Sequence, residues 1–150
     1  MATGSYSELL SSSTIRLDHL EELMAAGRRD FRLRYALDYA SCHPQADLSL
    51  RRLAALTNLS VWHICRLFRD EVGISPARCI KLLRLKYAAE LLVNTSLSVK
   101  EVVAAVGIND VSHFVRDFRS VTGEFPVEYR TRVRGQADFC VAHSANAKGG

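Results

Sequence analysis

The cysteines and histidines are the residues of this 150-residue sequence with the widest choice of chemistry. Structural zinc sites use cysteine pairs about two to four residues apart, and no pair here has that spacing. The four cysteines stand at Cys42, Cys65, Cys79 and Cys140. His63 lies near Cys65 and His43 adjoins Cys42, but neither pair has two further ligands at a suitable spacing. We therefore predict reduced thiols and no bound metal.

Catalysis by the same residues is also disfavoured. Cys42 and His43 are adjacent, and adjacent side chains on a helix point about 100° apart. No set of nucleophile, base and orienting group can be assembled from the sequence. A DNA-repair protein would need a zinc-binding cysteine cluster, which the spacing does not provide. We predict no catalytic residue and no cofactor.

A different chemistry is carried by arginines that recur fifty residues apart. When the chain is shifted by 50, Arg51–Pro76 aligns with Glu101–Pro126 with nine identities in 26 positions. Two of the identities are arginine pairs, Arg66/Arg116 and Arg69/Arg119. The alignment predicts that one small structural unit occurs twice.

The repeated arginines fall on the outward face of a predicted helix in each unit. At about 100° per residue, the apolar positions Ile64, Leu67 and Phe68 share one side, as do Phe114 and Phe118 in the second unit. The opposite sides carry Trp62, Cys65, Arg66 and Arg69 in the first unit, and Ser112, Val115, Arg116 and Arg119 in the second. One such face could simply be solvated. Its repetition favours DNA, because arginine can donate to guanine in the major groove while cap residues and other basic groups hold phosphates.

Capping residues predict where the paired helices begin and end. Ser49 starts a helix that runs to about Thr57, and Ser60 starts a second helix that ends near Gly73. In the second unit, a capping box of Ser98 and Glu101 starts a helix that stops at Gly107, and Asp110 starts a helix that runs to about Thr122. Each unit therefore has a helix, a turn and a second helix.

A long helix is predicted between the two units. Ser75 is a suitable cap and Pro76 suits the first helical position. One arc of about 140° collects the apolar residues Ala77, Ile80, Leu85, Ala88, Leu91 and Leu92. Arg84 falls in the same arc, so we expect it to be paired or to reach out of the core. A helix over Pro76–Val93 would be a rod of roughly 27 Å that separates the units.

The remaining segments complete an all-helical fold, because none alternates apolar and polar residues between hairpin turns. Helices are expected at 31–41 and 126–132, and an amphipathic helix at 15–26 between Thr14 and Gly27. We expect about seven helices plus the N-terminal one. The predicted divisions are an extension over 1–29, a helix-turn-helix subdomain over 30–74, a linker helix over 75–94, a second subdomain over 95–134 and a flexible tail over 135–150.

Charge is concentrated in the centre of the chain. Residues 1–48 hold 5 Lys/Arg and 7 Asp/Glu, residues 49–134 hold 14 and 8, and residues 135–150 hold one of each. A basic central block is typical of a protein that meets a polyanion. No apolar run approaches the roughly 20 residues of a membrane span, and the N-terminus does not read as a secretory signal. We therefore expect a cytoplasmic protein with no membrane partner.

These residues together resemble the DNA-binding domain of the AraC/XylS family of bacterial transcription regulators. The resemblance covers roughly residues 31–134 and rests on the motifs Leu48-Ser49-Leu50, Leu53-Ala54, Leu67-Phe68-Arg69, Gly73-Ile74-Ser75-Pro76, Arg84-Leu85, Ala88, Leu91-Leu92, Val106-Gly107, Asp110, Ser112-His113-Phe114, Arg116, Phe118-Arg119, Gly123, Pro126 and Tyr129-Arg130. It implies seven helices, with two recognition helices entering successive major-groove segments on one face of the DNA.

The resemblance also implies which side chains touch DNA. The matching base-reading positions are Trp62, Cys65, Arg66, Ser112, His113 and Arg116. Phosphate contacts are expected from Ser60, Arg69, Asp110 and Arg119. An activator bound near a promoter in the bacterial nucleoid, in contact with RNA polymerase, is the function that the family implies.

Five positions depart from the family pattern. Ile108 and Cys79 stand where aromatic residues are usual, which predicts smaller local packing. Phe125 replaces the usual Ser or Thr before Pro126, which removes a cap worth about 1 kcal/mol and would loosen the last helix. Cys65 and Val115 occupy outward places where polar readers are common, so the base preference does not follow from the sequence.

Two further questions stay open at the level of sequence. About 30 residues precede the first domain helix, too few for a separate sensing domain, so the chain is either a stand-alone regulator or the C-terminal piece of a longer one. The alternative function is a helical protein-interaction module, in which 15–26 pairs with a partner helix. Weak self-association through that helix is a related expectation.

Overall fold

The computed structural model of the chain describes residue 17, residues 20–26 and residues 30–146, and the described residues form helices and no strands. The predicted helix over 15–26 is seen as α2 (Leu20–Ala26), while Thr14, Gly27 and most of residues 15–19 lie outside the described part. The chain packs as two units, residues 1–87 and 88–150. The boundary falls inside one helix, α6 (Pro76–Asn94).

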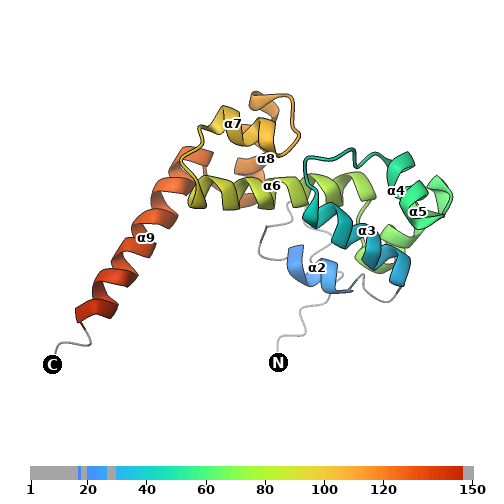
Figure 1. Cartoon of the computed structure of the whole chain (residues 1–150), viewed down its shortest axis with the longest axis horizontal. Helices are drawn as coiled ribbons and strands as arrows, with labels where there is room; N and C mark the ends of the chain where they lie inside the picture. Colours follow the sequence, from blue (N-terminus) through green and yellow to red (C-terminus); the bar gives the residue numbers. More distant parts are fainter. Residues whose placement is uncertain (1–16, 18–19, 27–29, 147–150) are drawn as a thin grey trace. The chain divides into compact units, whose positions relative to one another are not determined.

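The first unit is built from short helices (Figure 1). Its elements are α2, α3 (Phe31–Cys42), α4 (Leu50–Thr57), α5 (Val61–Leu67), a π-helical turn η2 (Phe68–Val72) and the beginning of α6. Ser49 Oγ accepts from Arg52 N at 3.3 Å and Ser60 Oγ accepts from His63 N at 3.1 Å, which confirms both caps. Gly73 ends η2 with φ 83°, as its predicted left-handed role requires.

Helix α2 packs against its own unit. Leu20 is fully buried, and Glu21 accepts a hydrogen bond from Lys86 Nζ at 2.6 Å. The apolar side of α2 that Leu20 occupies is therefore already covered by the first unit.

The second unit repeats the arrangement. It comprises the end of α6, α7 (Val99–Ala105), α8 (Val111–Thr122) and α9 (Pro126–Asn146). The predicted capping box is present: Ser98 Oγ accepts from Glu101 N, and Glu101 accepts from Ser98 N at 2.7 Å. Asp110 caps α8, and Gly123 follows it with φ 83°.

Helix α6 does not carry the single apolar stripe that the sequence predicts. Ala77 is exposed and Leu91 is half-buried, whereas five residues outside the stripe are buried: Pro76, Cys79, Leu82, Leu83 and Ala89. The buried residues of the first half centre on a side of α6 roughly opposite to those of the second half. A single stripe was the wrong expectation because the two halves of α6 belong to the cores of different units.

Two arginines fifty residues apart, Arg84 and Arg134, donate to backbone carbonyls in or next to connecting loops. Arg84 Nε donates to Pro44 O at 3.0 Å and its Nη2 to Ala46 O at 3.2 Å, which confirms that Arg84 is paired. Fifty residues later, Arg134 Nε donates to Val93 O at 2.9 Å and its Nη2 to Thr95 O. The internal repeat therefore extends beyond Pro76 and Pro126 to the arginines that satisfy these carbonyls.

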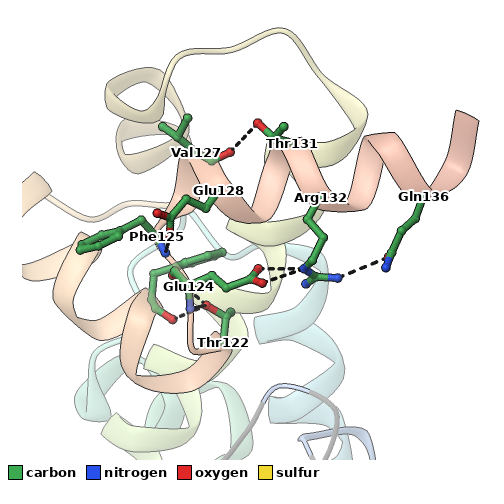
Figure 2. Close-up of polar contacts among 9 residues, drawn as sticks. Thr122, Glu124, Phe125, Val127, Glu128, Thr131, Arg132 and Gln136 are labelled. Carbon is green, nitrogen blue, oxygen red and sulfur yellow. Dashed lines mark hydrogen bonds and ion pairs between the residues drawn. The ribbon is translucent and has the colours of Figure 1, made fainter.

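Helix α9 is longer than predicted. It continues from Pro126 to Asn146, so residues 135–146, expected as a flexible tail, are helical. A glycine inside a helix costs only about 1 kcal/mol, and no proline follows Gly135 to end the helix. Its start is also secured despite the missing Ser or Thr cap, because Glu128 accepts from Phe125 N at 3.1 Å and Arg132 pairs with Glu124 at 2.8 Å (Figure 2).

The cap of α3 makes the stability of the first unit sensitive to acid. Asp30 accepts from Arg32 N at 2.8 Å and from Arg32 Nη2 at 2.9 Å, and the side-chain bond lowers the pKa of Asp30 from 3.8 to about 2. The ionised Asp30 carboxylate stabilises the fold above about pH 4, and this stabilisation is lost as the pH falls towards 2.

In Asp30→Asn, which keeps a capping oxygen without the charge, the free energy of unfolding should be lower than in the wild type at neutral pH. The difference should shrink in this acid range in denaturant titrations. A constant difference across it would contradict the assignment.

Candidate nucleic-acid interface

Helix α5 and the η2 turn that continues it are anchored in the core on one side and exposed on the other. Ile64 is fully buried and Phe68 is 1% exposed, while Trp62 is 68% exposed. Arg66 and Arg69 are also exposed, and Cys65 is half-buried. The predicted inward and outward sides of this helix are therefore confirmed, except that Leu67 is half-buried rather than buried.

Arg66 has partners one helical turn away in both directions. Its guanidinium lies 5.5 Å from the centre of the Trp62 ring, and its Nε lies 3.4 Å from Asp70 Oδ2. Both charged side chains are 62% exposed, so the ion pair contributes little to stability. The two contacts nonetheless align Arg66 along the helix surface, where it can exchange Asp70 for another acceptor.

Helix α8, which corresponds to α5 in the repeat, is capped at its start by Asp110. Asp110 Oδ1 accepts from His113 N at 2.9 Å, and Oδ2 lies 2.9 Å from His113 Nδ1. The hydrogen bonds from His113, first that of its backbone, lower the pKa of Asp110. A carboxylate that stays ionised can orient His113 and cap the helix, but it has no proton to donate to a phosphate.

Aromatic packing fixes the inner side of α8. Phe114 is 1% exposed and Phe118 is fully buried, with their ring centres 5.5 Å apart. Phe118 also meets Tyr129 of α9 edge-on, at 5.4 Å and 86°. The outer side shows Ser112, His113, Arg116 and Arg119 to solvent, as predicted, with Val115 half-buried.

The two outward arginines of α8 differ in their surroundings. Within the part of the chain that the structure describes, Arg116 has no ion pair or hydrogen bond from its side chain. Arg119 lies over the ring of Phe125, 4.5 Å from its centre. In the first unit the order is reversed: Arg66 stacks on an aromatic ring and Arg69 has no such contact among the described residues.

Sequence reasoning missed two residues of this surface. Asp70 stands four residues after Arg66, so helical spacing alone could have indicated the pair. Phe125 belongs to the turn before α9, and no periodic signal connects it with Arg119.

The structure also describes the cysteines and histidines that were candidates for metal binding or catalysis. Cys42 is exposed, and the His43 ring stacks on Tyr39 at 4.6 Å. Burial raises the pKa of Cys79 to about 12, so that thiol stays protonated and unreactive. In residues 17, 20–26 and 30–146, no three His, Cys, Asp or Glu side chains gather as a metal site would need. None of the helices described there is long and apolar enough to cross a membrane.

Two helix-turn-helix units, each with outward arginines on its second helix, define the class of protein. Comparison with known proteins agrees: residues 53–132 match the helix-turn-helix domain family. The MmsAB operon regulatory protein of Pseudomonas aeruginosa is 40% identical over 96 residues, which are 64% of this chain and 31% of that protein. The transcriptional activator NphR of a Rhodococcus species is 33% identical over 130 residues, 87% of this chain and 36% of that protein.

A solved structure with bound DNA is also similar. The DNA-binding domain of AdpA, determined in complex with a target DNA, aligns with a TM-score of 0.63 and 27% identity, covering 67% of this chain and 91% of that one. The chain belongs to the AraC-type helix-turn-helix family of DNA-binding transcription regulators. It spans about a third of the length of the two curated relatives above.

Proposed function

We propose that the chain binds duplex DNA in a sequence-specific manner by placing α5 and α8 in successive major-groove segments. The observation that carries the proposal is the repeated pair of exposed arginines, Arg66 with Arg69 and Arg116 with Arg119, on helices whose opposite sides are anchored in a core. Packing alone gives no reason for the same outward residues in both units. A DNA groove gives such a reason, because it presents guanine edges and phosphates that arginine can bind.

The proposal assigns different tasks to the two positions of each pair. Base edges are read by Arg66 and Arg116, together with Trp62, Cys65, Ser112 and His113. Phosphates are held by Arg69, Arg119 and the hydroxyl of Ser60. Asp110 contributes by fixing His113 and the start of α8, because its carboxylate accepts hydrogen bonds and is repelled by phosphate.

The regulatory outcome that we propose is activation, in contact with RNA polymerase in the bacterial cytoplasm. Support comes from the relative NphR, which is named as a transcriptional activator. We also propose weak self-association through the N-terminal segment, by residues other than Leu20, which is already buried in its own unit. Transcription in vitro from a promoter that carries the bound site tests activation directly.

Selection of bound duplexes from a random pool, repeated over a salt titration, tests the DNA-binding proposal. A defined consensus and a steep fall of affinity with salt are the expected results. Recovery of no consensus, with affinity that does not depend on salt, would favour the protein-interaction alternative.

The salt titration also tests the phosphate assignment. Arg69→Ala and Arg119→Ala should each reduce the slope of log affinity against log salt by about one, with similar weakening on all sequences. Arg34→Ala is the matched control, because it removes the same charge from an exposed side chain of α3, a helix to which we assign no DNA contact. If the control changes the slope as much as the test variants, the effect reflects net charge alone.

A further inference from the structure

The aromatic ring of Phe125 is not needed to start α9. Phe125 is 41% exposed and stands directly before α9, where its carbonyl accepts the first helical hydrogen bond from Tyr129 N at 2.9 Å. Its counterpart fifty residues earlier is Ser75, whose hydroxyl accepts from Arg78 N at 3.3 Å as a helix cap should. A serine at position 125 would therefore serve the start of α9 at least as well.

The hydrogen bonds around Phe125 involve its backbone and not its ring. Glu128 accepts from Phe125 N at 3.1 Å, so the backbone at this turn is satisfied without the side chain. Figure 2 shows the ring directed away from the pair formed by Glu124 and Arg132. What the ring does meet is the guanidinium of Arg119, 4.5 Å from its centre.

We infer that Phe125 is a positioning residue, which holds Arg119 in the direction from which it binds a DNA phosphate. The inference rests on the proposed DNA-binding function. An arginine held against an aromatic ring still presents N–H donors to phosphate oxygens, because its guanidinium carries five of them. Stacking before DNA arrives also removes part of the rotamer entropy that a free arginine would lose on binding. The first unit lacks this device at Arg69, because its counterpart turn carries Ser75 instead of an aromatic residue.

The test is a double-mutant cycle on the full chain with a random-sequence duplex of about three helical turns as the probe. Phe125→Ser should weaken binding about threefold, which corresponds to part of the rotamer entropy that a long side chain loses when binding immobilises it. It restores the cap hydroxyl, so its thermal stability should equal or exceed that of the wild type. Phe125→Tyr should bind as the wild type does, and Phe125→Leu, which keeps the apolar bulk but no ring, should bind as Phe125→Ser does.

The decisive measurement is made in the Arg119→Ala background, where Phe125→Ser should have no further effect on affinity. The same loss in both backgrounds would overturn the inference, because Phe125 would then act without Arg119. No loss in the wild-type background would overturn it as well. If the wild-type chain itself fails to bind the duplex, the proposed function has failed, which is a separate outcome from an additive cycle on a chain that binds.

Discussion

Arg116→Ala should lower the affinity for the selected duplex by roughly five- to 150-fold, the range expected for one lost bidentate contact to guanine. Arg116 is exposed, stands on a helix anchored by Phe114 and Phe118, and has no ion pair within the described chain that would have to break first. The fold should not change, because no core contact is removed. Titration of the selected and the random duplex by fluorescence anisotropy measures both affinities.

Arg66→Ala should lower the affinity for the selected duplex by a factor in the same range, but a second variant is needed to interpret the loss. Removal of Arg66 leaves Asp70 without its partner, and an unpaired carboxylate near DNA repels phosphate. Arg66→Ala combined with Asp70→Asn separates this repulsion from the lost base contact. An equal loss of affinity on the selected and random duplexes, for either arginine, would refute its assignment as a reader of bases.

Phe118→Ala should destabilise the second unit by about 3–5 kcal/mol, a large share of the 5–15 kcal/mol that ordinary domains have. Phe118 is fully buried between Phe114 and Tyr129, so truncation removes both ring contacts and leaves a cavity. Far-UV circular dichroism in a denaturant titration measures the change over the whole chain. Trp62 is the single tryptophan and lies in the first unit, so its fluorescence reports that unit alone.

The matched control for this prediction is Val127→Ala. Val127 is 60% exposed and also belongs to the second unit, so its truncation should change the free energy of unfolding by less than about 0.5 kcal/mol. A loss in Phe118→Ala no larger than in this control would show that the aromatic cluster is not the core of the unit.

Local signals were sufficient to predict most helix boundaries of the two units. Ser49, Ser60, Ser98 and Asp110 all cap as expected, because a cap bond joins residues two or three positions apart and depends little on the rest of the fold. The outward arginines were predictable for a similar reason: the fifty-residue repeat and the helical period are both visible in one sequence.

Features that depend on packing between elements were not predictable. A single apolar stripe on α6 would require one packing neighbour, and this expectation is wrong at Ala77 and Leu82 because the helix contributes to two cores. The flexible tail expected from residue 135 is helical to Asn146, because a single glycine is a small cost inside a helix. The stack of Arg119 on Phe125 joins two elements across a turn, so only the folded chain reveals it.

The unit boundary inside α6 limits how the chain can be divided in the laboratory. A cut between Tyr87 and Ala88 would sever a continuous helix and leave apolar stubs, with Leu83 and Leu85 near one new end and Ala89 and Leu92 near the other. Such stubs fray and promote aggregation. A fragment meant to carry a single unit should therefore retain Pro76–Asn94 whole, with solubilising substitutions on whichever half of that helix loses its cover.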